Sequence, residues 1–155
     1  MVAVVRRREQ LARTVRAILE NVEDGRVRGT REFQDIDFKE EAGRRNGREI
    51  EPGQPQNSVA ATHMADEVAC MANTPGGGAL ILGVENGSGK IIGTELDRDW
   101  LRQRIYQMVN VAPDIVEKNV EGQRLLVLYV AESREPVENT GDALRWRVGD
   151  SCVAV

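Results

Sequence analysis

The chain has 155 residues, of which 41% are hydrophobic and 30% are charged, a composition typical of one soluble globular domain. Its formal net charge of −4 argues against a protein that binds nucleic acid through overall positive charge. Because no apolar run approaches the ~20 residues of a membrane span, we expect a cytoplasmic protein without membrane contact. The two cysteines, Cys70 and Cys152, are interpreted as small core residues of a reducing compartment.

The first part of the chain predicts an amphipathic helix followed by a strand. Residues 7–24 carry apolar side chains at helical spacing, and Gly25 and Gly29 close the helix, which docks on the domain or on a partner. Residues 32–40 predict a strand with Ile36 and Phe38 on one face and Asp35, Asp37 and Lys39 on the other. Residues 43–57, rich in glycine and proline, predict a long loop.

Two further helices and two hairpins are predicted beyond this loop. Ser58 is a candidate cap for a helix that ends near Asn73, with candidate buried positions at Val59, Met64, Val68 and Met71. Asp97 or Asp99 caps a second helix that ends before Pro113. Residues 115–120 and 124–130 predict a hairpin, and residues 143–148 an alternating strand followed by strand-like residues 152–155. His63, the single histidine, has no ligand at metal spacing and is interpreted as structural or exposed.

The most distinctive stretch runs from Ala72 to Gly93, with the sequence ANTPGGGALILGVENGSGKIIG. It predicts a helix end, a three-glycine corner, a strand buried on both faces, a tight turn and a returning strand. Neither nucleotide-binding glycine pattern fits, because a P-loop needs four residues between its glycines and a dinucleotide fingerprint must open a helix. The glycines therefore predict a corner and a turn.

This stretch resembles the signature of the Schlafen AlbA-2 domain family, which is described as DNA-binding. Three further segments agree in order: Asp37-Phe38-Lys39, a segment containing Pro113 before a hairpin, and Arg145-Trp146-Arg147-Val148-Gly149. The resemblance covers about residues 30 to 152 and implies an α+β domain, a mixed β-sheet with about three helices. We therefore divide the chain into an N-terminal helix and turn, 1–29, and a Schlafen AlbA-2-like domain, 30–155. Family members often continue into a second domain, so the apolar last strand predicts a chain trimmed before such a domain.

The resemblance also implies a metal site like that of the Schlafen ribonucleases. At the matching positions this chain carries Glu32, Asp37 and Glu85, whose oxygens suit Mg²⁺ or Mn²⁺, and the lysine of the motif is Lys39, which could neutralise a phosphate. Residues five apart on a regular strand point to opposite faces, so Glu32 and Asp37 converge only if the strand bends. The alternative is that the three carboxylates are solvated surface charges.

Three functions remain open. The first is a module that binds RNA or DNA phosphates through cationic side chains, for which the candidates are Lys39, Arg44, Arg45, Arg145 and Arg147. The second is a metal-dependent endoribonuclease that uses Glu32, Asp37, Glu85 and Lys39. The third is a dimerisation or regulatory interaction domain. Because the larger Schlafen proteins pair two such lobes and this chain has one, we expect a homodimer that uses its N-terminal helix.

Overall fold

The structure, a computed structural model, describes residues 2–28 and 35–155. Its centre is a four-stranded mixed sheet with the strand order β3-β6-β8-β7, in which β3 and β6 are parallel and the other neighbours antiparallel. These strands are β3 (Ile36–Lys39), β6 (Gly78–Leu82), β7 (Asp114–Val120) and β8 (Gln123–Val130).

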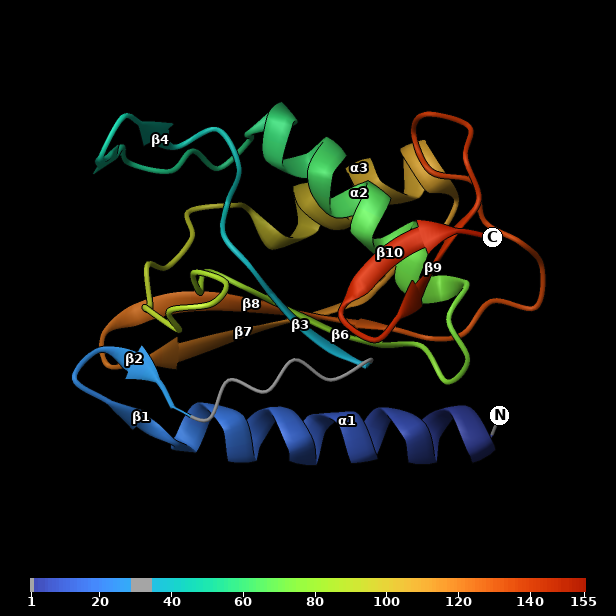
Figure 1. The fold of residues 1–155 in the computed structure, drawn as a ribbon, viewed down its shortest axis with the longest axis horizontal. Helices are drawn as coiled ribbons and strands as arrows, with labels where there is room; N and C mark the ends of the chain where they lie inside the picture. Colours follow the sequence, from blue (N-terminus) through green and yellow to red (C-terminus); the bar gives the residue numbers. More distant parts are fainter. Residues whose placement is uncertain (1, 29–34) are drawn as a thin grey trace.

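Helices cover both faces of this sheet (Figure 1). One face packs against α1 (Val2–Glu20), and the other packs against α2 (Ser58–Ala72) and α3 (Arg98–Val109). The described residues thus confirm the predicted α+β class with a mixed sheet and three helices. None of these helices has the length and apolar character that a membrane span requires.

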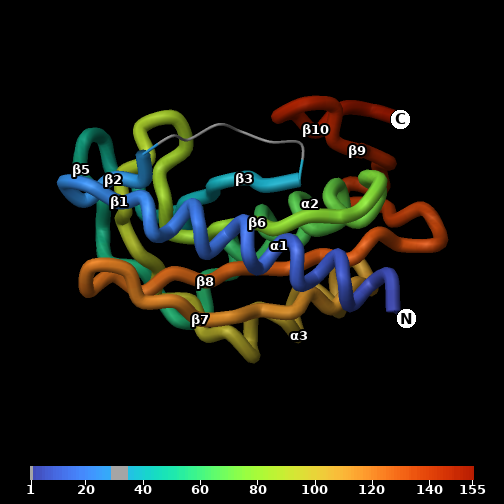
Figure 2. The backbone as a smooth tube through the Cα atoms, turned by 90° about the horizontal axis from the view of Figure 1, so that it is seen from below, coloured from blue at the N-terminus to red at the C-terminus, as the bar shows by residue number. Residues whose placement is uncertain are grey.

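Three two-stranded hairpins surround the central sheet: β1 (Val22–Glu23) with β2 (Arg26–Val27), β4 (Arg45–Asn46) with β5 (Glu49–Ile50), and β9 (Arg145–Val148) with β10 (Ser151–Ala154). The predicted loop at residues 43–57 therefore contains a short hairpin. The β9–β10 hairpin lies beside α2, and both ends of the chain lie at the same end of the molecule (Figures 1 and 2).

Strand β6 is buried on both faces, as its uninterrupted apolar run predicts. Leu80 and Leu82 pack with α2 and α3, while Ala79 and Ile81 pack with α1. Because parallel strands need a crossover connection, α2 returns the chain from β3 to β6. The corner before β6 requires glycine at Gly77, where φ is +62° and a Cβ would lie 2.1 Å from the Val130 carbonyl oxygen.

Two helix boundaries differ from the prediction. Helix α1 begins at Val2 and ends at Glu20, because a turn with positive φ at Asp24 and Gly25 follows it. The cap of α2 is Asn57 rather than Ser58, since the Asn57 side chain accepts a hydrogen bond from the Ala60 amide at 3.1 Å. The predicted burial of Val59 is wrong, because at the exposed start of α2 its side chain contacts solvent.

Glu41 is a buried carboxylate that ties the segment after β3 to two other loops. It accepts hydrogen bonds from the Gln54 amide, the Asn57 side chain, the Thr94 hydroxyl and the Glu95 amide, at 2.7–3.1 Å. Burial favours the neutral acid, but these four donors outweigh it and lower the pKa of Glu41.

We predict that Glu41→Gln destabilises the protein by about 2 kcal/mol at pH 7, because the amide cannot accept all four hydrogen bonds. The folded pKa is depressed, so the carboxylate stabilises the protein above its unfolded pKa, and this stabilisation is lost as the pH falls through the folded value. Urea unfolding of both proteins between pH 7 and pH 3 measures this. An unchanged difference in unfolding free energy across that range would contradict the assignment.

Candidate nucleic-acid interface

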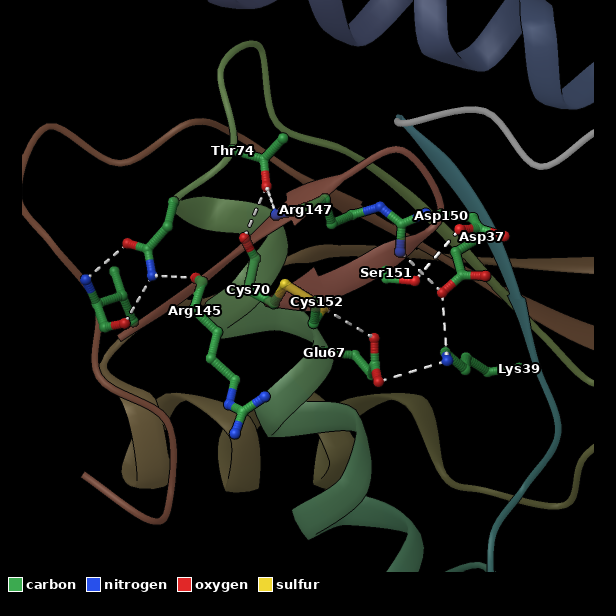
Figure 3. Close-up of a disulfide and its surroundings, with 12 residues drawn as sticks. Asp37, Lys39, Glu67, Cys70, Thr74, Arg145, Arg147, Asp150, Ser151 and Cys152 are labelled. Carbon is green, nitrogen blue, oxygen red and sulfur yellow. Dashed lines mark hydrogen bonds and ion pairs between the residues drawn. A yellow bond between two sulfur atoms is a disulfide. The ribbon is translucent and has the colours of Figure 1, made fainter. Parts of the chain in front are cut away.

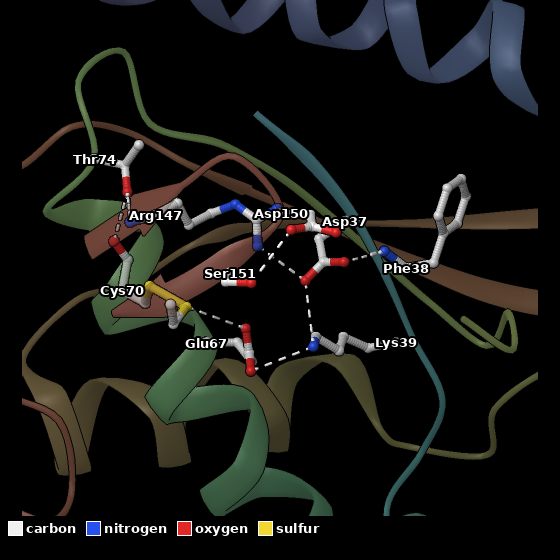
Figure 4. A network of polar contacts seen from close by, with 10 residues as sticks. Asp37, Phe38, Lys39, Glu67, Cys70, Thr74, Arg147, Asp150 and Ser151 are labelled. Atoms are coloured by element: carbon white, nitrogen blue, oxygen red, sulfur yellow. Dashed lines mark hydrogen bonds and ion pairs between the residues drawn. A yellow bond between two sulfur atoms is a disulfide. The ribbon is translucent and has the colours of Figure 1, made fainter. Parts of the chain in front are cut away.

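Most of the predicted site residues belong to two groups that share Lys39, and Glu32 lies outside the described residues. Asp37, Lys39 and Arg147 form a buried network between β3, α2 and the β9–β10 hairpin (Figure 4). Lys39 also lines a cavity with Arg45 and Glu85 at the carboxyl ends of β3 and β6. Arg44 and Arg145 belong to neither group.

The buried network is centred on the Asp37 carboxylate, whose side chain is 2% exposed. Its Oδ2 accepts a hydrogen bond from Arg147 Nη1 at 3.1 Å and lies 3.3 Å from Lys39 Nζ. Its Oδ1 accepts from the Phe38 amide at 2.9 Å. Lys39 continues the network to Glu67 on α2, at 3.4 Å. Burial opposes the charge on Lys39, but Glu67 and Asp37 outweigh it and raise the pKa of the ammonium.

The structure gives Arg147 a role different from the predicted phosphate contact. Its side chain is 1% exposed and forms an ion pair with Asp37. Its backbone amide donates a hydrogen bond to the Thr74 hydroxyl at 2.9 Å. Arg145 and Arg147 do share one face of β9, as the alternation predicts. Only Arg147 reaches inward, whereas Arg145 is exposed and points away from Asp37 (Figure 3). Arg147 therefore anchors the hairpin, and Arg145 remains available at the surface.

The interpretation of the cysteines as separate core residues is wrong. Cys70 on α2 and Cys152 on β10 form a disulfide across 82 residues of sequence, next to the buried network (Figure 3). The disulfide removes the cysteine argument for a reducing compartment, because such bonds persist mainly in oxidising environments. The cytoplasmic location stays a prediction.

The second group lines a cavity of about 430 Å³. Lys39 ends β3 and Glu40 follows it, Glu85 lies after β6, Arg45 belongs to β4, and His63 lines the cavity from α2. The carboxyl ends of adjacent parallel strands meet at one edge of a sheet, where ligands of open α/β sheets commonly bind. The expectation that His63 is structural or exposed holds, but its place beside Lys39 and Arg45 follows only from the packing of α2.

Arg45 is held by two carboxylates in this cavity. It donates to both oxygens of Glu40, at 2.8 and 2.7 Å, and also to Glu85. Both carboxylates raise the pKa of Arg45. The hydrogen bond from the Ser88 hydroxyl lowers the pKa of Glu85 most, and the hydrogen bond from Arg45 lowers it further. Because the Arg45 side chain is 44% exposed, these ion pairs are weak and can exchange with another anion.

Arg44 has a structural role instead. Its guanidinium donates to the carbonyl oxygens of Glu51 at 2.7 Å and Gly93 at 2.9 Å. It therefore joins the β4–β5 hairpin to the segment after β6. Its guanidinium holds two backbone carbonyl oxygens in place, whereas Arg45 is held by side-chain carboxylates that can move.

The described residues do not fit the metal site that the resemblance implies. Asp37 is bonded to Arg147, Lys39 and the Phe38 amide, and Glu85 is bonded to Arg45 and Ser88. No group of three histidine, cysteine or acidic side chains within residues 2–28 and 35–155 is arranged to hold a metal ion. Because Glu32 lies outside these residues, the three-carboxylate cluster stays a prediction.

We predict that Arg147→Met destabilises the protein by about 3–5 kcal/mol, because among the described residues it leaves Lys39 as the remaining cation beside the buried Asp37 carboxylate. Urea unfolding measures the loss. Arg145→Met is the matched control, two residues away on the same face but exposed, and its effect should stay within about 0.5 kcal/mol. Similar losses in the two variants would contradict the anchoring role of Arg147.

Comparison with known proteins agrees with the resemblance found in the sequence. The sequence model of the family described as Schlafen, AlbA_2 matches residues 32–155. A solved structure of the DIP2311 protein from Corynebacterium diphtheriae is 64% identical to this chain, with a TM-score of 0.92. The match covers 96% of this chain and 30% of that one, so this chain spans less than a third of the DIP2311 chain.

A second solved structure is more distant. It is the N-terminal domain of a protein from Nitrosomonas europaea described as related to the ATP-dependent DNA helicase RecG, 25% identical with a TM-score of 0.45. That match covers 88% of this chain and 90% of the domain. None of the curated proteins compared with this chain matches it significantly.

Proposed function

The chain belongs to the Schlafen AlbA_2 family, and from this premise we propose that it is a nucleic-acid-binding module that contacts phosphates of RNA or DNA. The principal contact surface is the cavity at the carboxyl ends of β3 and β6, where Arg45 and Lys39 provide the positive charge. The observation that carries this proposal is the convergence of both cations with His63 on one cavity.

Arg45 is the strongest candidate for a phosphate contact in this cavity. A guanidinium matches the planar geometry of two phosphate oxygens, as it matches the two oxygens of Glu40 here. The half-buried carboxylate partners hold the Arg45 side chain in place and leave it exposed to solvent. A phosphate can therefore replace Glu40 and Glu85 at modest cost, which makes this arrangement a preformed anion site with competing carboxylates.

Arg145 supports a second phosphate contact. Its side chain is exposed on β9, and among the described residues no ion-pair partner holds it. The nearby backbone is fixed, since the Asn73 side chain donates to the Arg145 carbonyl oxygen at 2.9 Å. A free guanidinium on a fixed strand suits a positioning contact that carries no sequence information.

We predict that Arg45→Ala weakens binding to RNA and DNA across sequences. Each lost phosphate contact should reduce the slope of log K against log [salt] by about 0.7 for single strands and about 0.9 for duplex DNA. Fluorescence anisotropy with single-stranded RNA, duplex DNA and tRNA at several KCl concentrations measures this. Arg98→Ala is the matched control, because Arg98 is an arginine of similar exposure beside a carboxylate on α3. Equal slopes for wild type and Arg45→Ala would remove the cavity from the binding surface.

The metal-dependent endoribonuclease remains the alternative function, and Glu85→Gln distinguishes it from the binding module. As a competitor for Arg45, Glu85 weakens phosphate binding, so the substitution should increase affinity. As a ligand for Mg²⁺ or Mn²⁺ beside Glu32 and Asp37, Glu85 is required for metal binding. A functional metal site would then stabilise the wild-type fold by about 2.7 kcal/mol at a hundredfold excess over Kd, and Glu85→Gln would lose this gain.

Thermal unfolding with and without Mn²⁺, together with tRNA cleavage, measures the alternative. We expect no metal-dependent shift and tighter RNA binding by Glu85→Gln. A metal-dependent shift and cleavage in the wild type, both lost in Glu85→Gln, would favour the nuclease.

A further inference from the structure

The β9–β10 hairpin is held to the rest of the molecule by a few specific contacts. Among the described residues it shares no strand pairing with the central sheet, and Trp146 and Val153, which face each other across the hairpin, are exposed. A two-stranded hairpin is at best marginally stable on its own in water. The position of this hairpin therefore depends on its contacts with α2, with β3 and with the segment after α2.

Two of these contacts meet at one position of the hairpin. Cys152 on β10 lies directly opposite Arg147 on β9, so both side chains belong to the same inner face. Cys152 is joined to Cys70 on α2 by the disulfide (Figure 3). Arg147 is paired with the buried Asp37 on β3. The covalent link and the buried ion pair thus fix the same cross-strand pair of residues.

The disulfide favours the docked hairpin because it joins segments that are 82 residues apart in the sequence. An undocked hairpin without this bond gains conformational freedom, which opposes docking. Cross-links that close long loops restrict such open states most strongly. The ion pair alone holds the hairpin less firmly, because both of its charges regain hydration when the hairpin leaves the domain.

The two cysteines differ in their access to solvent. Cys70 is buried, with 2% of its surface exposed, whereas Cys152 on the hairpin is only partly buried. A thiolate that approaches from solvent therefore reaches Cys152 first. The Sγ atom of Cys152 also lies 3.8 Å from Glu67 Oε2, and Glu67 pairs with Lys39, so the disulfide borders the buried polar network (Figure 4).

We propose that this disulfide is a redox-sensitive latch, which a dithiol reductant opens so that the hairpin undocks and the Arg147 side chain becomes exposed. One thiolate of the reductant attacks Cys152 Sγ, the disulfide breaks, and Cys70 leaves as a thiolate that takes up a proton. The second thiolate of the reductant then attacks the mixed disulfide, and Cys152 leaves and is protonated. The reductant becomes a disulfide and has given up two electrons. The reverse exchange with an oxidised dithiol closes the latch.

The latch determines how many arginines β9 presents to a ligand. With the hairpin docked, Arg145 is exposed and the Arg147 side chain is withdrawn to Asp37. Undocking exposes both guanidinium groups on one face of the strand, since side chains two residues apart share a face. The reduced chain thereby gains a phosphate contact. This consequence rests on the proposed function, whereas the latch itself does not.

Amide hydrogen exchange of the full chain, measured by NMR before and after reduction with dithiothreitol, tests the latch. Labelling with iodoacetamide verifies the two states, because the oxidised chain has no free thiol and the reduced chain has two. The direct probe is the Arg147 amide, which is bonded to the Thr74 hydroxyl. We expect its protection to fall by about tenfold or more on reduction, while the amides of β6 and β8 keep theirs.

Cys152→Ser is the variant that lacks the latch. Its hairpin amides should exchange as fast as those of the reduced wild type and should not respond to dithiothreitol. Equal protection of the Arg147 amide before and after reduction would overturn the proposal. A loss of protection that extends to β6 and β8 would also contradict it, because the disulfide would then support the whole fold and not the hairpin alone.

Fluorescence anisotropy with single-stranded RNA at several KCl concentrations tests the consequence for binding. The slope of log K against log [salt] should be steeper for the reduced protein by about 0.7, because one phosphate contact is gained. Equal slopes in the two redox states would overturn the release of Arg147 to phosphate. A failure of the proposed function is distinguishable, since it appears as an unchanged slope in Arg45→Ala and leaves the hydrogen-exchange result as it is.

Discussion

The buried ion pair between Asp37 and Arg147 is the interaction on which the rest of the structure depends. It joins β3 in the central sheet to the β9–β10 hairpin, which shares no strand pairing with that sheet. A buried pair contributes little net stability compared with apolar side chains of the same shape, but loss of one partner is costly, so the pair mainly specifies where the hairpin docks. The disulfide of Cys152 with Cys70 and the hydrogen bond of Arg147 to Thr74 fix the same hairpin to α2 and the segment after it.

This one constraint determines which side chains remain available for function. Asp37 is held by two cations and a backbone amide, so it is not free to bind a metal ion as it stands in the structure. Arg147 is withdrawn from the surface for the same reason, while Arg145 and Arg45 stay exposed. The alternation of β9 then turns Trp146 outward. The burial of Arg147, which was predicted to contact phosphate, and the exposure of Trp146 therefore both follow from the same buried pair.

The fold class could be predicted from the sequence because helices and strands leave patterns among residues that are close together in the chain. Periodicity identified the three helices, the apolar run identified β6, and the alternation of residues 143–148 assigned the faces of β9 correctly. Alternation cannot tell which face is buried, and for β9 the usual assumption of an inward apolar face fails because Asp37, 110 residues away, requires a cation. The disulfide could not be predicted for the same reason: a separation of 82 residues carries no information on distance in space.

The candidate site could be predicted in part because β3 and β6 are parallel. A parallel pair brings the residues after each strand to the same edge, and this brings Lys39 and Glu85 to one cavity although they are far apart in sequence. The sequence could not show that Arg45 joins them or that its guanidinium stays exposed in these ion pairs. That exposure decides the chemistry: Arg147 and Arg45 both bind carboxylates, but water is excluded from the first pair and reaches the second. The buried pair therefore acts as a permanent anchor, whereas the solvent-accessible pair suits the proposed exchange of its carboxylates for a phosphate.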